Sequence, residues 1–193
     1  MVVINSTLLW SDHVDKISSK ISKNIFLLRN LANNLSQEVL KTAYFALIQS
    51  HLEYSILVWG HSASSDRLFR LQRRALRIVA GLRYREDCKQ YFGKLNIMTL
   101  PFLYIYNSLI YIWEKLSTYK SLNSYHNYDT RTCDLAYNYL RLERCRCATN
   151  YFGVKFFNKL PTYFRSLSFN QFKIEIKELL IKDTLYSIGD FFK

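Results

Sequence analysis

The stretch SDRLFRLQRRALRIVAGL, residues 65–82, contains the strongest structural signal in this chain of 193 residues. At a helical step of about 100° per residue, its apolar side chains fall on one arc of about 100°. They are Leu68, Leu71, Ala75, Ile78, Val79 and Leu82. The opposite arc holds Arg67, Arg70, Arg73, Arg74 and Arg77. The pattern predicts a helix that starts near residues 62–66, ends at a left-handed Gly81, and has one core face and one guanidinium face.

This arginine face dominates the charge of the chain. Residues 62–85 contain seven Arg and one Asp, a net charge of +6, which is half of the formal +12. Guanidinium groups bind phosphate bidentately, so five of them along about three turns match a run of backbone phosphates. A charged face can also be merely solvated, but solvated helices usually mix both signs, and this helix has a single acidic residue, Asp66 in its first turn, against five arginines. We therefore expect sequence-independent binding of a nucleic-acid backbone, with Arg83 and Arg85 extending the face.

Hydrophobic periodicity predicts further helices on both sides. A helix capped by Ser11 has apolar residues at three- and four-residue steps, at Val14, Ile17, Ile21, Ile25 and Leu28. A second, capped by Ser36, is expected to continue towards Trp59. Later helices are expected near residues 87–94, from Pro101 to about Lys115, and over residues 170–182.

The composition and the order of elements indicate a mainly α protein. With 49% hydrophobic residues the chain can build a core, and only 5 Gly and 2 Pro argue against a many-turned all-β fold. A polar stretch at residues 119–133 predicts a linker loop between a helical domain, residues 1–118, and a C-terminal region, residues 134–193. Short strands are expected at residues 134–142 and 152–157. The prediction is a bundle of three to five helices followed by a smaller mixed α+β region.

The cysteines and histidines provide weak signals for metal binding. Four scattered cysteines indicate reduced thiols and an intracellular protein. Zinc could be bound by His126, Cys133, Cys145 and Cys147. The eleven residues between Cys133 and Cys145 and the C-x-C spacing are unlike a zinc knuckle, so ordinary thiols are favoured and no metal or cofactor is expected.

Catalysis by these residues alone is not expected. The sequence has no adjacent pair of aspartates, no Gly-rich phosphate loop and no Ser-centred elbow. The histidines His13, His51 and His61 are predicted to be structural, and Glu53 is predicted to pair with Arg73 or Arg74. Residues 97–113 lack charge, but their polar residues favour a buried helix over a membrane span.

Several segments resemble a known family. The runs AYFALIQSHLEYSILVWG, residues 43–60, and LQRRALRIVAGL, residues 71–82, are similar to the thumb of reverse transcriptases from non-LTR retrotransposons (LINE elements), especially the jockey type. The opening VVINSTLLWSDHVDKISSKISK, residues 2–23, resembles the passage from the end of the palm into the first thumb helix. LPFLYIYNSLIYI, residues 100–112, and GVKFFNKLP, residues 153–161, also fit. The resemblance covers nearly the whole chain.

This resemblance implies a fragment of an RNA-directed DNA polymerase. Residues 1–10 would be the remnant of the palm-end hairpin, and the catalytic aspartates with their Mg²⁺ would belong to the missing palm. The thumb grips template RNA and growing DNA, and the matching positions are the five arginines of residues 67–77. The part after residue 119 resembles the C-terminal extension of the family, where RNA or target-DNA contact is expected at Arg131, Arg141, Arg144 and Arg146.

The implied partners are RNA, the RNA/DNA hybrid backbone, and the palm and fingers of the parent polymerase. No membrane or small-molecule partner is expected, and the location would be a cytoplasmic ribonucleoprotein or the nucleus. Two alternatives stay open on the sequence alone. The chain could be an inert remnant of a decayed transposable element, or a recruited host protein that binds RNA or acts as a basic adaptor.

Overall fold

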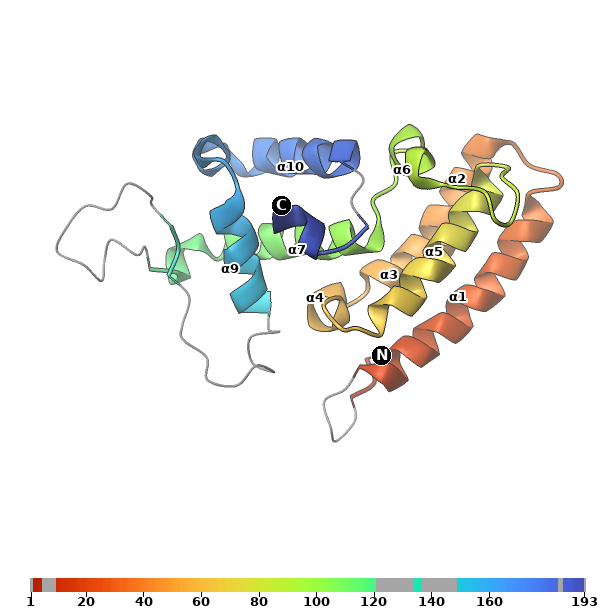
Figure 1. The fold of residues 1–193 in the computed structure, drawn as a ribbon, viewed down its shortest axis with the longest axis horizontal. Helices are drawn as coiled ribbons and strands as arrows, with labels where there is room; N and C mark the ends of the chain where they lie inside the picture. The colour runs from red at the N-terminus through yellow and green to blue at the C-terminus, as the bar shows by residue number, and fades with distance from the viewer. Residues whose placement is uncertain (1, 5–9, 121–133, 137–148, 184–185, 193) are drawn as a thin grey trace.

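A computed structural model describes residues 2–4, 10–120, 134–136, 149–183 and 186–192. The regular elements within these ranges are helical, which confirms the mainly α fold class (Figure 1). The strand predicted at residues 152–157 is wrong, because these residues lie inside helix α9 (Thr149–Lys159). Of the strand predicted at residues 134–142, only residues 134–136 belong to the described part, and they form no extended ladder.

One group of helices contains α1 (Ser11–Leu31), α2 (Gln37–Tyr44) and α5 (Ser65–Val79), which lie side by side in Figure 1. Helix α1 packs along α5, and α2 contacts both. The apolar stripe predicted for the first helix is confirmed, since α1 buries Val14, Ile17, Ile21, Ile25 and Leu28. Because α1 and α5 run in the same direction, each turn of α5 has a counterpart on α1.

The second predicted helix does not continue unbroken to Trp59. After α2 the chain passes through a π-helical turn, η1 (Phe45–Gln49), and the short α3 (Ser50–Glu53). Ser55 then adopts a left-handed backbone, φ 55°, before α4 (Ile56–Trp59). The break frees the Tyr54 carbonyl, which accepts a 3.0 Å hydrogen bond from the indole N–H of Trp59. This bond satisfies the polar atom of a fully buried Trp59.

Helix α7 (Leu100–Glu114) joins this group to a second one, as Figure 1 shows. Pro101 lies in its first turn, as predicted. Helices α3 and α4 contact α7, and so do α9 and α10 (Phe169–Asp183). The short α6 (Lys89–Lys94) contacts α10. The remaining elements are 3-10 turns, η2 (Leu116–Thr118), η4 (Thr162–Ser166) and η5 (Gly189–Phe192).

Gly153 allows α9 to pack close to α7. A Cβ atom at this position would lie 2.7 Å from Cγ1 of Ile112, well inside van der Waals contact. Helix α9 therefore rests directly on α7, and its Phe156 and Phe157 are buried there. In the parts of the chain that the structure describes, no helix is both long and apolar enough to cross a membrane.

Candidate nucleic-acid interface

Gln72 fixes the rotation of α5 about its own axis. Its side-chain amide is completely buried and donates hydrogen bonds to Tyr44 Oη and to the Met98 carbonyl, both at 2.9 Å. Its Oε1 accepts a 2.8 Å hydrogen bond from the backbone N–H of Leu100. The Gln72 side chain thus connects α5 to α2 and to the start of α7. Burial of this amide costs little because its hydrogen bonds are made.

The buried face of α5 consequently differs from the predicted one. It comprises Leu68, Phe69, Gln72, Ala75, Leu76 and Val79. At about 100° per residue, this face is turned by about 70° from the predicted arc. Leu71, Ile78 and Leu82, all predicted as core, are only half-buried. The predicted separation of core and arginines is nevertheless kept, because each arginine of α5 remains outside the buried face.

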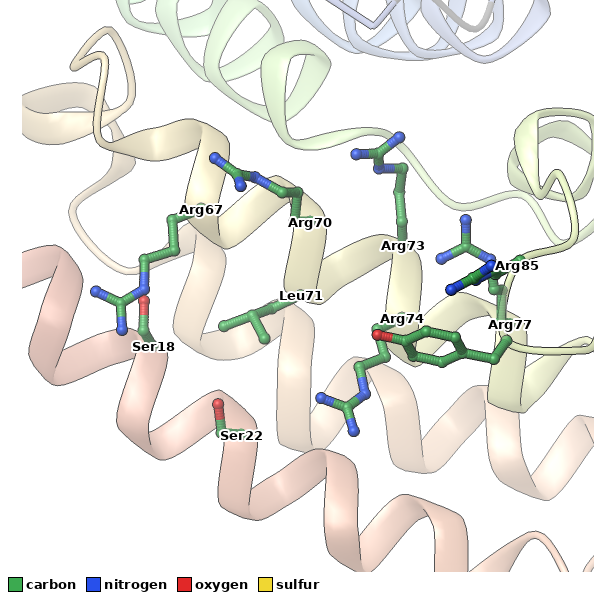
Figure 2. A pocket seen from close by; sticks show the side chains of 10 residues that line it. Ser18, Ser22, Arg67, Arg70, Leu71, Arg73, Arg74, Arg77 and Arg85 are labelled. Atoms are coloured by element: carbon green, nitrogen blue, oxygen red, sulfur yellow. The ribbon is translucent and has the colours of Figure 1, made fainter.

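The arginines form one wall of an open groove of about 530 Å³ between α5 and α1 (Figure 2). We call it the arginine groove. Its lining from α5 and the following turn comprises Arg67, Arg70, Leu71, Arg73, Arg74, Arg77, Tyr84 and Arg85. Helix α1 contributes Ser18 and Ser22. Six of the ten predicted site residues therefore meet in one place.

The other four predicted residues do not line this groove. Arg83 is exposed on the turn that follows α5. The remaining positions, Arg131, Arg144 and Arg146, lie outside the described residues, as does Arg141.

Arg67 differs from its neighbours because it has an acidic partner. Its guanidinium forms an ion pair with Asp15 of α1, and the two side chains are 59% and 60% exposed. The acidic residue thus comes from another helix, which the composition of α5 alone does not reveal. An ion pair so open to water contributes about 0–1 kcal/mol and can exchange for a phosphate at little cost.

No other arginine of the groove forms an ion pair with a described residue. The predicted pairing of Glu53 with Arg73 or Arg74 is wrong. The Glu53 carboxylate instead accepts a 2.8 Å hydrogen bond from the side-chain amide of Gln49. Five guanidinium groups therefore share the groove without a compensating carboxylate in the described part of the chain, which leaves a strongly positive surface.

Aromatic rings orient two of these arginines. The Arg73 guanidinium carbon lies 5.1 Å from the centre of the Phe69 ring and 5.6 Å from that of Tyr186. The Arg74 guanidinium carbon lies 6.0 Å from the centre of the Tyr84 ring. The Nε atoms of both arginines are buried and have no hydrogen-bond partner among the described residues. Ring contacts hold these planar groups in place without occupying their donors.

Arg77 anchors the chain that follows α5. Its Nε donates a 2.7 Å hydrogen bond to the carbonyl of Glu86. The predicted left-handed end of the helix is confirmed at Gly81, which has φ 67°, and the N–H of Leu82 returns to the Arg77 carbonyl at 2.8 Å. The turn bearing Arg83 and Arg85 is thereby tied to the last turn of α5.

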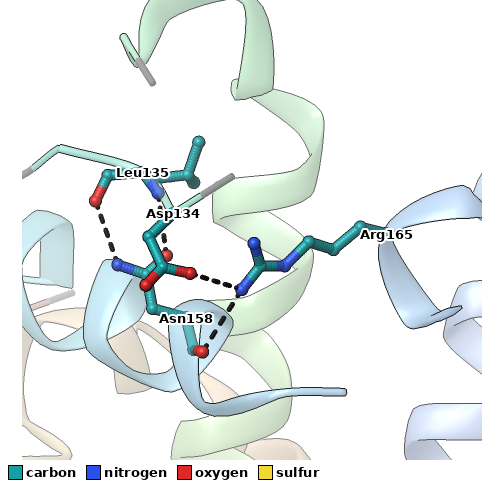
Figure 3. Close-up of polar contacts among 4 residues, drawn as sticks. All are labelled: Asp134, Leu135, Asn158 and Arg165. Carbon is teal, nitrogen blue, oxygen red and sulfur yellow. Dashed lines mark hydrogen bonds and ion pairs between the residues drawn. The ribbon is translucent and has the colours of Figure 1, made fainter. Parts of the chain in front are cut away.

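Arg165 shows how a basic residue is used structurally in the same chain. It contacts Asp134 at 2.8 Å and the carbonyl of Asn158 at 3.2 Å, as Figure 3 shows. The Asn158 amide meanwhile bonds both the N–H and the C=O of Leu135, each at 2.9 Å. This network fastens residues 134–136 to α9. Unlike the five groove arginines without an ion pair, Arg165 has its charge neutralised by a half-buried carboxylate.

The histidines and cysteines give no sign of a reactive centre in the described part of the chain. Burial lowers the pKa of His13, His51 and His61, so these side chains are neutral near pH 7. Burial raises the pKa of the Cys88 thiol. Among the described residues, no group of three or more His, Cys, Asp or Glu is placed to bind a metal ion. The zinc candidates His126, Cys133, Cys145 and Cys147 lie outside those residues.

Sequence reasoning missed three residues that shape the groove. The sequence could not indicate Ser18 and Ser22, because their place in the groove depends on which face of α1 packs against α5. Tyr84 had a signal, since it stands between Arg83 and Arg85. No protein-family model, curated protein or solved structure matches this chain. The function must therefore be inferred from the groove itself.

Proposed function

We propose that this protein binds the sugar-phosphate backbone of RNA and of RNA/DNA hybrids through the arginine groove, without sequence preference. The observation that supports this function is the convergence of six arginines on one open surface with a single exposed carboxylate partner. Like charges at such short spacing repel one another, and a polyanion relieves that repulsion. A protein that needed these residues only for solubility would gain more from mixed charges.

The spacing of the arginines suits a single backbone. Arg67 and Arg77 are ten residues apart on one helix, which corresponds to about 15 Å of axial rise. A nucleic-acid strand advances about 3.4 Å per phosphate along a duplex axis, so about four to five phosphates fit beside this part of α5. The donors available at Arg70, Arg73 and Arg74 favour bidentate contacts with phosphate oxygens.

The similarity of residues 2–23, 43–60 and 71–82 to non-LTR thumbs supports a more specific assignment. In this proposal the chain is the thumb and C-terminal extension of an RNA-directed DNA polymerase, and its protein partners are the palm and fingers of that enzyme. The palm supplies the Mg²⁺-binding aspartates. The protein would then reside with its RNA, in a cytoplasmic ribonucleoprotein or in the nucleus.

The salt dependence of binding tests the backbone-binding function. The equilibrium constant for a fluorescent RNA/DNA hybrid is measured by anisotropy between 50 and 300 mM KCl, a range chosen because counterion release makes the log–log plot linear. For the unmodified protein we expect a slope near −4, since each contacted phosphate contributes roughly 0.7 to 0.9. Changing Arg70, Arg73, Arg74 and Arg77 together to Ala should flatten the slope by about three units.

A matched variant removes the same charge elsewhere. Lys155 and Lys159 of α9 and Lys173 and Lys177 of α10 do not line the groove, and their joint change to Ala also lowers the net charge by four. This control should retain most of the slope and affinity. Equal losses in both variants would show a diffuse charge effect and would overturn the assignment of the groove.

A further inference from the structure

The turn after α5 presents one aromatic side chain at the end of the arginine groove. The backbone N–H of Glu86 donates to the Arg83 carbonyl at 3.2 Å, and the Glu86 carboxylate accepts a 3.1 Å hydrogen bond from the Arg83 N–H. Together with the Arg77 contact to the Glu86 carbonyl, these bonds fix a tight turn. Tyr84 lies at the second position of this turn, so its backbone is held in a fixed place relative to the arginines of α5.

Tyr84 is exposed to an extent that packing does not explain. Its side chain is 71% exposed, the largest value among the large hydrophobic residues that the structure describes. It lines the groove, and the guanidinium carbon of Arg74 lies 6.0 Å from the centre of its ring. The ring therefore offers a free face beside a surface suited to phosphates.

We propose that Tyr84 is a stacking platform for an unpaired base, so that the groove takes single-stranded nucleic acid in preference to a duplex. This inference rests on the proposed function. A strand whose phosphates lie along Arg70, Arg74 and Arg77 leads directly to the Tyr84 ring at the end of α5. An unpaired base can turn onto that ring, whereas the bases of a duplex are already stacked on one another. Base–aromatic stacking tolerates any base, in keeping with binding that does not depend on sequence.

Three 12-residue ligands separate stacking from charge. They are a single-stranded RNA, its DNA equivalent, and an abasic DNA strand with the same number of phosphates. With the full-length protein at 100 mM KCl, the strands with bases should bind about tenfold more tightly than the abasic strand. A blunt 12-base-pair duplex should gain nothing from Tyr84. RNA and DNA that bind alike would indicate recognition of the base face, and tighter binding of RNA alone would indicate an added sugar contact beside the same stack.

Substitutions of Tyr84 decide the assignment. Tyr84→Ala and Tyr84→Leu should both remove the tenfold advantage over the abasic strand, while Tyr84→Phe keeps it because the ring remains. The salt slope should be unchanged in all three, since no phosphate contact is lost. Tyr163→Ala, a control at a 51% exposed tyrosine of η4, should bind like the unmodified protein.

The possible outcomes distinguish failure of the stacking inference from failure of the proposed backbone-binding function. If Tyr84→Ala and Tyr84→Leu still prefer strands with bases, the stacking platform is refuted, although the arginine variants can still show backbone binding. If the abasic strand and the strands with bases bind equally well to the unmodified protein, the inference fails in the same way. A salt slope that stays unchanged when Arg70, Arg73, Arg74 and Arg77 are replaced by Ala would instead refute the proposed function.

Discussion

At the residue scale, Gln72 combines two roles on one side chain. Its three hydrogen bonds satisfy buried groups of Tyr44, Met98 and Leu100, and by doing so they determine which side of α5 is left for the groove. No periodicity of apolar residues can reveal such a position, because a polar residue on a helix normally indicates the solvent side. The predicted core face was therefore correct at Leu68, Ala75 and Val79. It was wrong at Leu71, Ile78 and Leu82, which are only half-buried.

Replacing Gln72 by Leu should destabilise the protein strongly. The change leaves the Leu100 N–H and the Met98 carbonyl buried without partners, and each unsatisfied group costs about 1–3 kcal/mol. We expect the free energy of unfolding to fall by about 2–4 kcal/mol in urea titration. Gln37→Leu is the matched control, because the exposed Gln37 makes one 3.3 Å bond to the Val79 carbonyl and should change stability by less than ~0.5 kcal/mol. Similar losses for both variants would contradict this role of Gln72.

His13 makes the protein sensitive to acid. Its side chain is 2% exposed, lies against the rings of Trp10 and Trp59, and accepts a hydrogen bond from the Val3 N–H. Burial is the main cause that lowers its pKa, so the folded state keeps it neutral while the unfolded state takes up a proton below about pH 6.5. The free energy of unfolding is therefore highest above that pH and declines as the pH falls from 6.5 towards the folded pKa.

The measurement is urea unfolding at pH 7.5 and pH 5.5. His51 and His61 act in the same direction, since burial also lowers their pKa values. His13→Phe should reduce the difference in stability between the two pH values, whatever it does to the stability at either one. A pH dependence that is unchanged in His13→Phe, or greater stability at pH 5.5, would be inconsistent with a buried neutral histidine.

At the element scale, the sequence predicted the long helices correctly and failed at one short aromatic run. The helices α1, α5 and α10 follow from the spacing of their apolar residues, and α7 follows from Pro101 and the long apolar run after it. The run at residues 152–157 is short and rich in Phe, a pattern that fits a strand and a buried helix equally well. The close packing of Gly153 against Ile112 favours the helical conformation. This contact joins residues 41 positions apart, so local sequence patterns do not reveal it.

Gly153→Ala tests the packing of α9 on α7. Its new Cβ would meet Ile112 Cγ1 at 2.7 Å, so the Ile112 side chain or the two helices must shift, and overpacking of this kind costs about 1–3 kcal/mol. The control is Gly93→Ala in α6, where the nearest atom is the Ile181 carbonyl oxygen at 3.8 Å. That change should stabilise by about 0.5–1 kcal/mol through helix propensity. Thermal melts that shift in the same direction for both variants would argue against close packing at Gly153.

At the scale of the whole molecule, the two helix groups share contacts that should make them unfold together. Helix α4 packs on α7, and the Tyr186 ring lies 5.1 Å from Phe69 and 6.2 Å from Phe92, centre to centre. Through Tyr186 the C-terminal segment also reaches Arg73 of the groove. The shape of the arginine groove therefore depends on residues at both ends of the chain.

A local reporter can test this coupling. Trp113 stacks on Phe172 with ring centres 4.3 Å apart, so its fluorescence reports on the second helix group once Trp10 and Trp59 are changed to Phe. In that one variant, urea curves from far-UV circular dichroism and from fluorescence should coincide, as expected for a two-state protein. Separate midpoints would mean that the two groups fold as independent domains.

The division of α5 between a buried face and an arginine face also limits how this sequence can change over evolutionary time. Substitutions on the groove side leave the core intact, and conservative changes on the core side leave the arginines in place. An insertion or deletion of one residue within residues 65–79 would instead turn every later side chain by about 100°, which moves arginines towards the core and apolar side chains towards solvent. In an alignment of relatives, this helix should therefore vary in residue type and contain no gaps.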